Sequence, residues 1–157
     1  MQSLLSGAVA GLAATVPMTA AMKAMHRQLP AGERYPLPPR PITMRAAHKA
    51  GVDVGHDLDE RQRTGLTLAA HFGYGTMVGA LYGPVAPRGM GAAILGGVGY
   101  GLLVWAGSYL GLLPALGLLS PATRHPARRN ALMIAAHVVW GAALGAVVSQ
   151  LRSDDDD

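Results

Sequence analysis

Residues 131–151 read ALMIAAHVVWGAALGAVVSQL, an apolar run without a charged side chain. An α-helix rises 1.5 Å per residue, so it needs roughly 20 apolar residues to cross the hydrocarbon core of a bilayer. This run is long enough, and three other segments of the chain are similarly long and poor in charge. We therefore predict membrane spans at residues 4–25, 64–86, 90–112 and 130–151.

The amino-acid composition agrees with a membrane bundle. Only 14% of the residues are charged, against roughly a quarter in ordinary soluble domains. Glycine is abundant with 21 residues, and there is a single phenylalanine. Membrane helices use small residues where their backbones approach each other. The prediction is an all-α polytopic membrane protein, a four-transmembrane-helix bundle that forms one domain over residues 1–157.

The distribution of basic residues predicts the orientation in the membrane. Most of the 13 Lys and Arg lie in the connections before the second and fourth spans, whereas Arg88 and Arg152 lie on the opposite side. Loops rich in Lys and Arg stay in the cytoplasm. We expect a cytoplasmic loop at residues 26–63 and both termini outside, including the acidic tail 152–157. This orientation requires residues 90–119 to cross once, and a second crossing within this run remains an open alternative.

The predicted cytoplasmic loop has three parts. Its proline-rich tract at residues 35–41 is expected to form extended polyproline II. A short amphipathic helix is expected over residues 42–50. Asp57, Asp59 and Glu60 then precede the second span. Together with His56 they resemble a divalent-cation site, but acidic side chains here more simply complement the positive end of a helix.

The second and fourth spans resemble each other. The sequence LAAHFGYG at residues 68–75 corresponds to IAAHVVWG at residues 134–141. Each residue pairs with the one 66 positions later, without a gap, as Leu68 does with Ile134. Thr64 and Asn130 correspond in the same frame, and both residue types are good N-caps. We predict an internal repeat of two duplicated helical hairpins, arranged in parallel about an axis along the membrane normal.

Small residues follow the repeated histidines at intervals of four, which places them on one face of each helix. Such faces pack closely in membranes. They are expected to join the two repeated helices to each other or to the first and third spans. The residues predicted for helix packing are Gly75, Gly79, Gly83, Gly141 and Gly145.

Polar side chains inside the spans form the candidate intramembrane polar site, which consists of His71, His137, Thr67 and Ser149. Polar groups in a span usually face the bundle interior. Three interpretations stay open: the rings fix helix register, they conduct protons or ions, or they bind a haem or metal through two imidazoles. The first is favoured, so no cofactor, metal site or catalytic residue is predicted. Whether His71 and His137 share a site does not follow from the sequence.

Two stretches resemble the YagU-type bacterial inner-membrane proteins. The first is Pro36-Leu37-Pro38-Pro39-Arg40, and the second runs from SYLGLLP at residues 108–114 to HVVW at residues 137–140. The resemblance implies a bacterial inner (cytoplasmic) membrane location and a role in survival under acid stress, and it supplies no catalytic residues.

The function expected from these features is that of a small inner-membrane protein of envelope and acid-stress homeostasis, not an enzyme. No nucleophile–base arrangement, phosphate-binding loop or zinc-protease motif is present in the sequence. Its expected partners are the lipid bilayer and, through the glycine faces, a second copy or another membrane protein. Nucleic acid is not expected, because the net charge of +4 follows from the positive-inside distribution.

Overall fold

The computed structural model describes residues 2–153, so most of the predicted acidic tail lies outside the described residues. Within them the fold is all-α, as predicted, and holds no strand. The long helices are α1 (Gln2–Arg27), α3 (Glu60–Tyr82), α4 (Met90–Ala106) and α6 (Ala127–Ser153). The shorter elements are η1 (Ala31–Glu33), α2 (Pro39–Lys49), η2 (Gly83–Val85), η3 (Gly107–Leu112), α5 (Leu113–Ala115) and η4 (Ala122–Arg124).

Three helices among the described residues are long and apolar enough to cross a membrane, rather than the predicted four. They are Ser3–Arg27, Met90–Ala115 and Ala127–Ser153. The remaining long helix, α3, does not qualify, because His71, its tyrosines and its glycines dilute the apolar side chains. Membrane-type helices are thus confirmed, but the count from the structure is three.

The long apolar run that begins at Met90 forms one continuous helical rod. α4 passes through η3, a π-helical turn, into α5, and the rod ends at Ala115. Gly117 has a φ of +63°, a conformation that suits glycine at a helix end. Residues 90–115 therefore do not fold into a hairpin, and the rod extends slightly beyond the predicted end at residue 112.

Two helix starts differ from those predicted. α3 begins at Glu60, because Asp59 and Gln62 form a capping box before it. The Asp59 side chain accepts a hydrogen bond from the backbone N–H of Gln62, and the Gln62 side chain accepts one from the backbone N–H of Asp59. Thr64 therefore lies inside the helix. Asn130 lies inside α6, and its Nδ2 donates to the carbonyl of Ala122 at 2.7 Å.

The start of α2 also differs from the prediction. This helix begins at Pro39, earlier than the expected residue 42, since proline is tolerated in the first turn of a helix. Only the beginning of the proline-rich tract, up to Pro38, therefore remains outside a helix.

Glycine contacts join α1 to α3. A Cβ built on Gly79 would lie 2.5 Å from the Cα of Gly11, and one built on Gly7 would lie 2.5 Å from the carbonyl oxygen of Gly79. Gly83 lies against Ser3 and Gly7 in the same way. No side chain fits at these positions, because the neighbouring group is backbone that cannot rotate away.

A second set of glycine contacts joins α4 to α6. Gly97 lies against the carbonyl of Gly141, and a Cβ on Gly141 would lie 2.9 Å from the Cα of Val98. A Cβ on Gly145 would lie 2.8 Å from the Cα of Ile94. The glycine faces of α3 and α6 thus meet α1 and α4 respectively, rather than each other.

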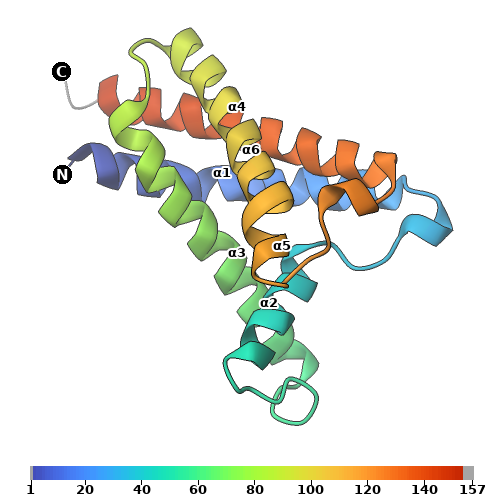
Figure 1. Cartoon of the computed structure of the whole chain (residues 1–157). Coiled ribbons are helices and arrows are strands. Elements are labelled where there is room, and N and C mark those ends of the chain that lie inside the picture. Colours follow the sequence, from blue (N-terminus) through green and yellow to red (C-terminus); the bar gives the residue numbers. More distant parts are fainter. Residues whose placement is uncertain (1, 154–157) are drawn as a thin grey trace.

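Figure 1 shows α1 and α6 side by side and antiparallel, with α3 and α4 on the outside. Their contact is the core of the molecule, where the most buried side chains include Ala10, Ala14, Leu144 and Val148. By contrast, α3 and α4 barely touch. Tyrosine hydroxyls link them instead: Tyr82 donates to the Ala93 carbonyl at 2.6 Å and Tyr100 donates to the Val78 carbonyl at 2.9 Å. The divergence of α3 and α4 leaves room for a cavity.

Candidate functional site

A cavity of about 570 Å³ lies between α3 and the continuous rod formed by α4, η3 and α5. We call it the α3–α4 cavity. α1 and α6 supply further parts of its wall, and α2 and α5 contribute at one end. The lining is mostly aliphatic and aromatic. Its hydroxyl and imidazole side chains are Thr15, Thr43, His71, Tyr74, Ser108, Tyr109 and His137.

His137 is the most enclosed ionisable group of this cavity, with 6% of its surface exposed. Its Nδ1 donates to the carbonyl oxygen of Met133 at 2.7 Å. This bond places the proton of a neutral ring on Nδ1 and leaves a lone pair on Nε2. The ring also meets Tyr109 edge-on, with 5.9 Å between centroids. His137 can therefore offer Nε2 as an acceptor or a metal ligand.

His71 lines the same cavity from α3. Its Nε2 is buried and has no hydrogen-bond partner within residues 2–153. The ring packs edge-on against Phe72 at 6.0 Å between centroids. A buried imidazole nitrogen without a partner is costly, so a ligand that supplied one would be favoured.

The two other polar residues predicted for this site lie elsewhere. Thr67 lies one turn before His71, and its Oγ1 donates to the carbonyl of Arg63 at 2.7 Å. Ser149 is buried in α6, about 18 Å along the helix axis from His137. Neither lines the α3–α4 cavity. The structure therefore brings together the two histidines but not the two hydroxyl groups.

Sequence reasoning missed Ser108 and Tyr109, which both line the cavity from the π-helical turn η3. The Ser108 Oγ and the Tyr74 hydroxyl lie 2.9 Å apart, which joins η3 to α3. π-Helical turns occur frequently at functional sites. The signal in the sequence for an irregular turn was the pair Gly107 and Gly111, which flanks these two residues shortly before Pro114.

α2 covers one end of the cavity and is held by its basic side chains. Arg40 forms a two-bond ion pair with Glu60 of α3, at 2.6 and 2.8 Å. Arg45 and Lys49 donate at 2.9 and 2.7 Å to backbone carbonyls just after α5. The opposite, less polar side of α2, which includes Ile42, faces the cavity. α2 thus connects α3 to the segment that follows α5 (Figure 1).

The attachment of α2 to α3 is expected to depend on pH. The hydrogen bonds from Arg40, and then its charge, lower the pKa of Glu60 below the ordinary value of 4.5. A lowered carboxyl pKa stabilises the folded state above the ordinary pKa, and this contribution disappears as pH falls through the lowered value. Amide hydrogen exchange in α2, corrected for its intrinsic pH dependence, should therefore accelerate below about pH 4.5. Glu60→Gln should remove this acceleration, and an equal acceleration in that variant would contradict the prediction.

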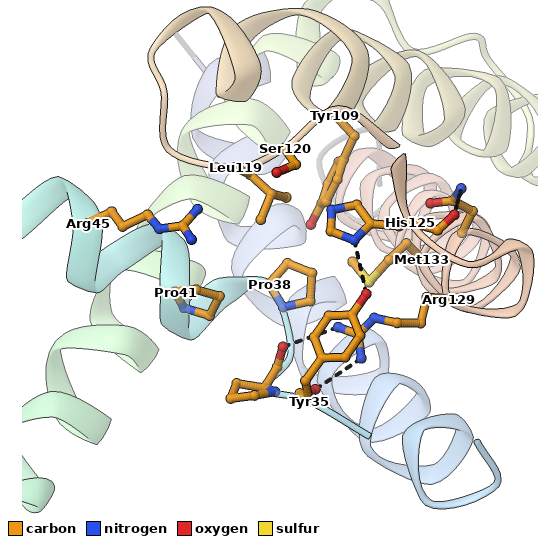
Figure 2. A pocket seen from close by; sticks show the side chains of 12 residues that line it. Tyr35, Pro38, Pro41, Arg45, Tyr109, Leu119, Ser120, His125, Arg129 and Met133 are labelled. Atoms are coloured by element: carbon orange, nitrogen blue, oxygen red, sulfur yellow. Dashed lines mark hydrogen bonds between the residues drawn. The ribbon is translucent and has the colours of Figure 1, made fainter. Parts of the chain in front are cut away.

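A second, smaller cavity of about 180 Å³ surrounds Arg129, and we call it the Arg129 cavity. Arg129 is only 6% exposed. Its Nη1 donates to the carbonyls of Glu33 and Tyr35 at 2.8 and 3.0 Å, and its Nη2 donates to the Pro36 carbonyl at 3.1 Å. Figure 2 shows the guanidinium against the ring of Tyr35, with 3.5 Å to the centroid. Arg129 therefore fastens the start of the proline-rich tract to α6.

Tyr35 completes this connection. Its hydroxyl lies 3.0 Å from Nδ1 of His125 (Figure 2), and its carbonyl lies 3.1 Å from Nε2 of His26. The sequence did not single out Arg129 as a candidate site residue. The stronger signal was a cation within the first turn of a long apolar helix, where a charge is costly unless it is well bonded.

Within the described part of the chain, no group of three or more His, Asp or Glu is placed to hold a metal ion. The histidine pair of the α3–α4 cavity is the nearest arrangement to a ligand set, with Nε2 of His137 as its available donor atom.

The apolar, membrane-length helices of this all-α bundle indicate an integral membrane protein. The chain belongs to the family described as "Protein of unknown function (DUF1440)", which matches residues 31–146. The matched part extends from the proline-rich tract to α6 and includes both histidines and Arg129. No curated protein and no solved structure matches the chain.

Proposed function

We propose that this chain is a non-catalytic membrane protein that binds a hydrophobic small molecule in the α3–α4 cavity. The observation that carries the proposal is the cavity itself. Its volume of about 570 Å³ lies within the range of roughly 300–1,000 Å³ for small-molecule sites. Such sites combine an apolar wall with a few polar groups that orient the ligand. His71, His137 and Ser108 are the polar groups in this role.

The proposed topology has α3 as a fourth span. α3 lies along α1 through backbone contacts at Gly75 and Gly79, and the positive-inside rule supports a cytoplasmic position for the loop that contains α2. Both termini are then outside the bacterial inner membrane. The resemblance to YagU-type proteins supports a setting in envelope and acid-stress homeostasis.

The two hairpins of the proposed duplication are α1 with α3 and α4 with α6. Their glycine contacts support it, because Gly11 lies against Gly75 in one pair as Gly97 lies against Gly141 in the other.

A bis-imidazole haem site is the second candidate function. It is supported by the two histidines that line the same cavity from α3 and α6 and by the lone pair on Nε2 of His137. The purified protein would then show a Soret band that disappears in His137→Ala. A colourless preparation that does not take up added haem would eliminate this candidate. A proton path is less well supported, because the lining of the cavity is mostly apolar.

Ligand binding is expected to be lost when the cavity is filled. Ala70 lines the cavity from α3, whereas its neighbour Ala69 does not. In nanodiscs, a photoactivatable hexadecanol should label α3 and α6, and Ala70→Phe should weaken its binding about tenfold, or about 1.4 kcal/mol. Ala69→Phe adds the same ring outside the cavity and should bind as the wild type does. Equal binding in the two variants would contradict the proposed site.

A further inference from the structure

The two cavities are neighbours, and the Arg129 cavity differs from the other by the arginine side chains in its lining. Tyr109 and Met133 line both of them, so these side chains form the partition between the apolar space and the Arg129 cavity. Figure 2 shows Tyr109 on one side of the Arg129 cavity, with Arg45 reaching toward it from α2. An amphiphile that lay across the partition would have its tail and its head group in matching surroundings.

The Arg129 cavity has an excess of positive charge. Arg45 and Arg129 line it together with His125, and no acidic side chain does. Within the described residues the one salt bridge joins Arg40 to Glu60, so no carboxylate lies within ion-pair distance of Arg129. Glu33 hydrogen-bonds Arg129 through its backbone carbonyl, and its carboxylate acts on the Arg129 charge only from beyond ion-pair distance. A buried guanidinium without a directly bonded counter-ion favours an anion beside it.

Hydrogen-bond donors remain available for such an anion. The three bonds from Arg129 to backbone carbonyls use both protons of Nη1 and one of Nη2. A guanidinium has five N–H donors, so the Nε proton and the second Nη2 proton remain. His125 adds a buried Nε2 without a partner in the described part of the chain. Guanidinium groups bind phosphate and carboxylate oxygens in this geometry.

We propose that the ligand is a single-chain anionic lipid, with its phosphate or carboxylate in the Arg129 cavity and its hydrocarbon chain in the α3–α4 cavity. This inference rests on the proposed function and adds the ligand's chemical class. The partition at Tyr109 and Met133 is the point where head group and chain meet. Neutral amphiphiles then occupy only the apolar part of the site.

The first test varies the head group on a constant chain. Hexadecyl phosphate, palmitate, hexadecanol and inorganic phosphate compete with photoactivatable hexadecanol for the full-length protein in nanodiscs made of neutral lipid. At least one of the two anionic amphiphiles should compete more than about tenfold better than hexadecanol, as expected for charged hydrogen bonds. The stronger of the two identifies the head group. Inorganic phosphate should not compete, because it lacks the chain, and competition by it would overturn the proposal of a lipid.

The outcomes separate this inference from the proposed function. Equal competition by hexadecanol and both anionic amphiphiles would overturn the anionic class while the hydrophobic ligand stands. Absence of labelling and of competition by any amphiphile would overturn both.

The second test removes the positive charge. Arg129→Gln keeps an N–H donor for the backbone carbonyls and should weaken binding of the anionic amphiphile about tenfold while hexadecanol binding stays constant. Arg124→Gln, at an exposed position outside the cavity, is the matched control. An equal loss for hexadecanol and the anionic amphiphile would show a structural role only. If Arg129→Gln does not fold, Arg45→Gln applies the same comparison at a solvent-exposed side chain.

Discussion

Replacing Gly97 by valine is expected to separate α4 from α6 and to destabilise the bundle more than any other single change described above. The Cβ would meet the carbonyl of Gly141, and it would lie 3.1 Å from the backbone nitrogen of Gly145. Overpacking a core typically costs about 1–3 kcal/mol. Because the obstacle is backbone rather than a side chain that can change rotamer, we expect at least the upper end of this range, about 3 kcal/mol. Reversible unfolding in mixed micelles, followed by tryptophan fluorescence, measures the loss.

Gly99→Val is the matched control for this prediction. Gly99 lies on the same helix, and a Cβ built on it meets nothing within 4 Å. The propensity change from glycine to valine is the same at both positions, so it cancels in the comparison. Equal stability of Gly97→Val and Gly99→Val would show that the α4–α6 contact is looser than the structure has it.

Helix periodicity predicts which glycines share a face, but it does not predict which helix packs against that face. Residues four apart share a face, so the sequence indicated that Gly75 and Gly79 form one surface on α3. The choice of partner depends on tertiary arrangement, which periodicity does not contain. α3 could meet α1 or α6 by this criterion, and it meets α1 because Gly7 and Gly11 allow the backbones to touch.

The candidate site shows the same limit. His71 and His137 were recognised because an imidazole in an apolar span is conspicuous. Thr67 was assigned to the site because it shares the face of His71, yet its hydroxyl satisfies a carbonyl of its own helix. Ser108 and Tyr109 were missed because they reach the cavity from a π-helical turn, and a 3.6-residue period does not anticipate its register.

Replacing Arg129 by methionine is expected to release the proline-rich tract from α6. Methionine keeps an unbranched apolar stem but leaves the carbonyls of Glu33, Tyr35 and Pro36 without their donor. A hydrogen bond from a charged group contributes about 1.5–3 kcal/mol, and removing the buried charge offsets part of this sum. A net loss of about 2–4 kcal/mol is therefore expected for the attachment of residues 31–38, since three bonds and the contact with Tyr35 disappear together.

Limited proteolysis and amide hydrogen exchange measure this release directly. In Arg129→Met, exchange across residues 31–38 should accelerate strongly, while α1 and α4 stay protected, because their glycine contacts lie far along the bundle from the tract. Arg128→Met is the control, since Arg128 is an exposed neighbour with no hydrogen bond to the tract among those of the described residues. Unchanged protection of the tract in Arg129→Met would mean that the prolines alone hold it in place. Loss of protection throughout the bundle would instead make Arg129 a group on which the whole fold depends.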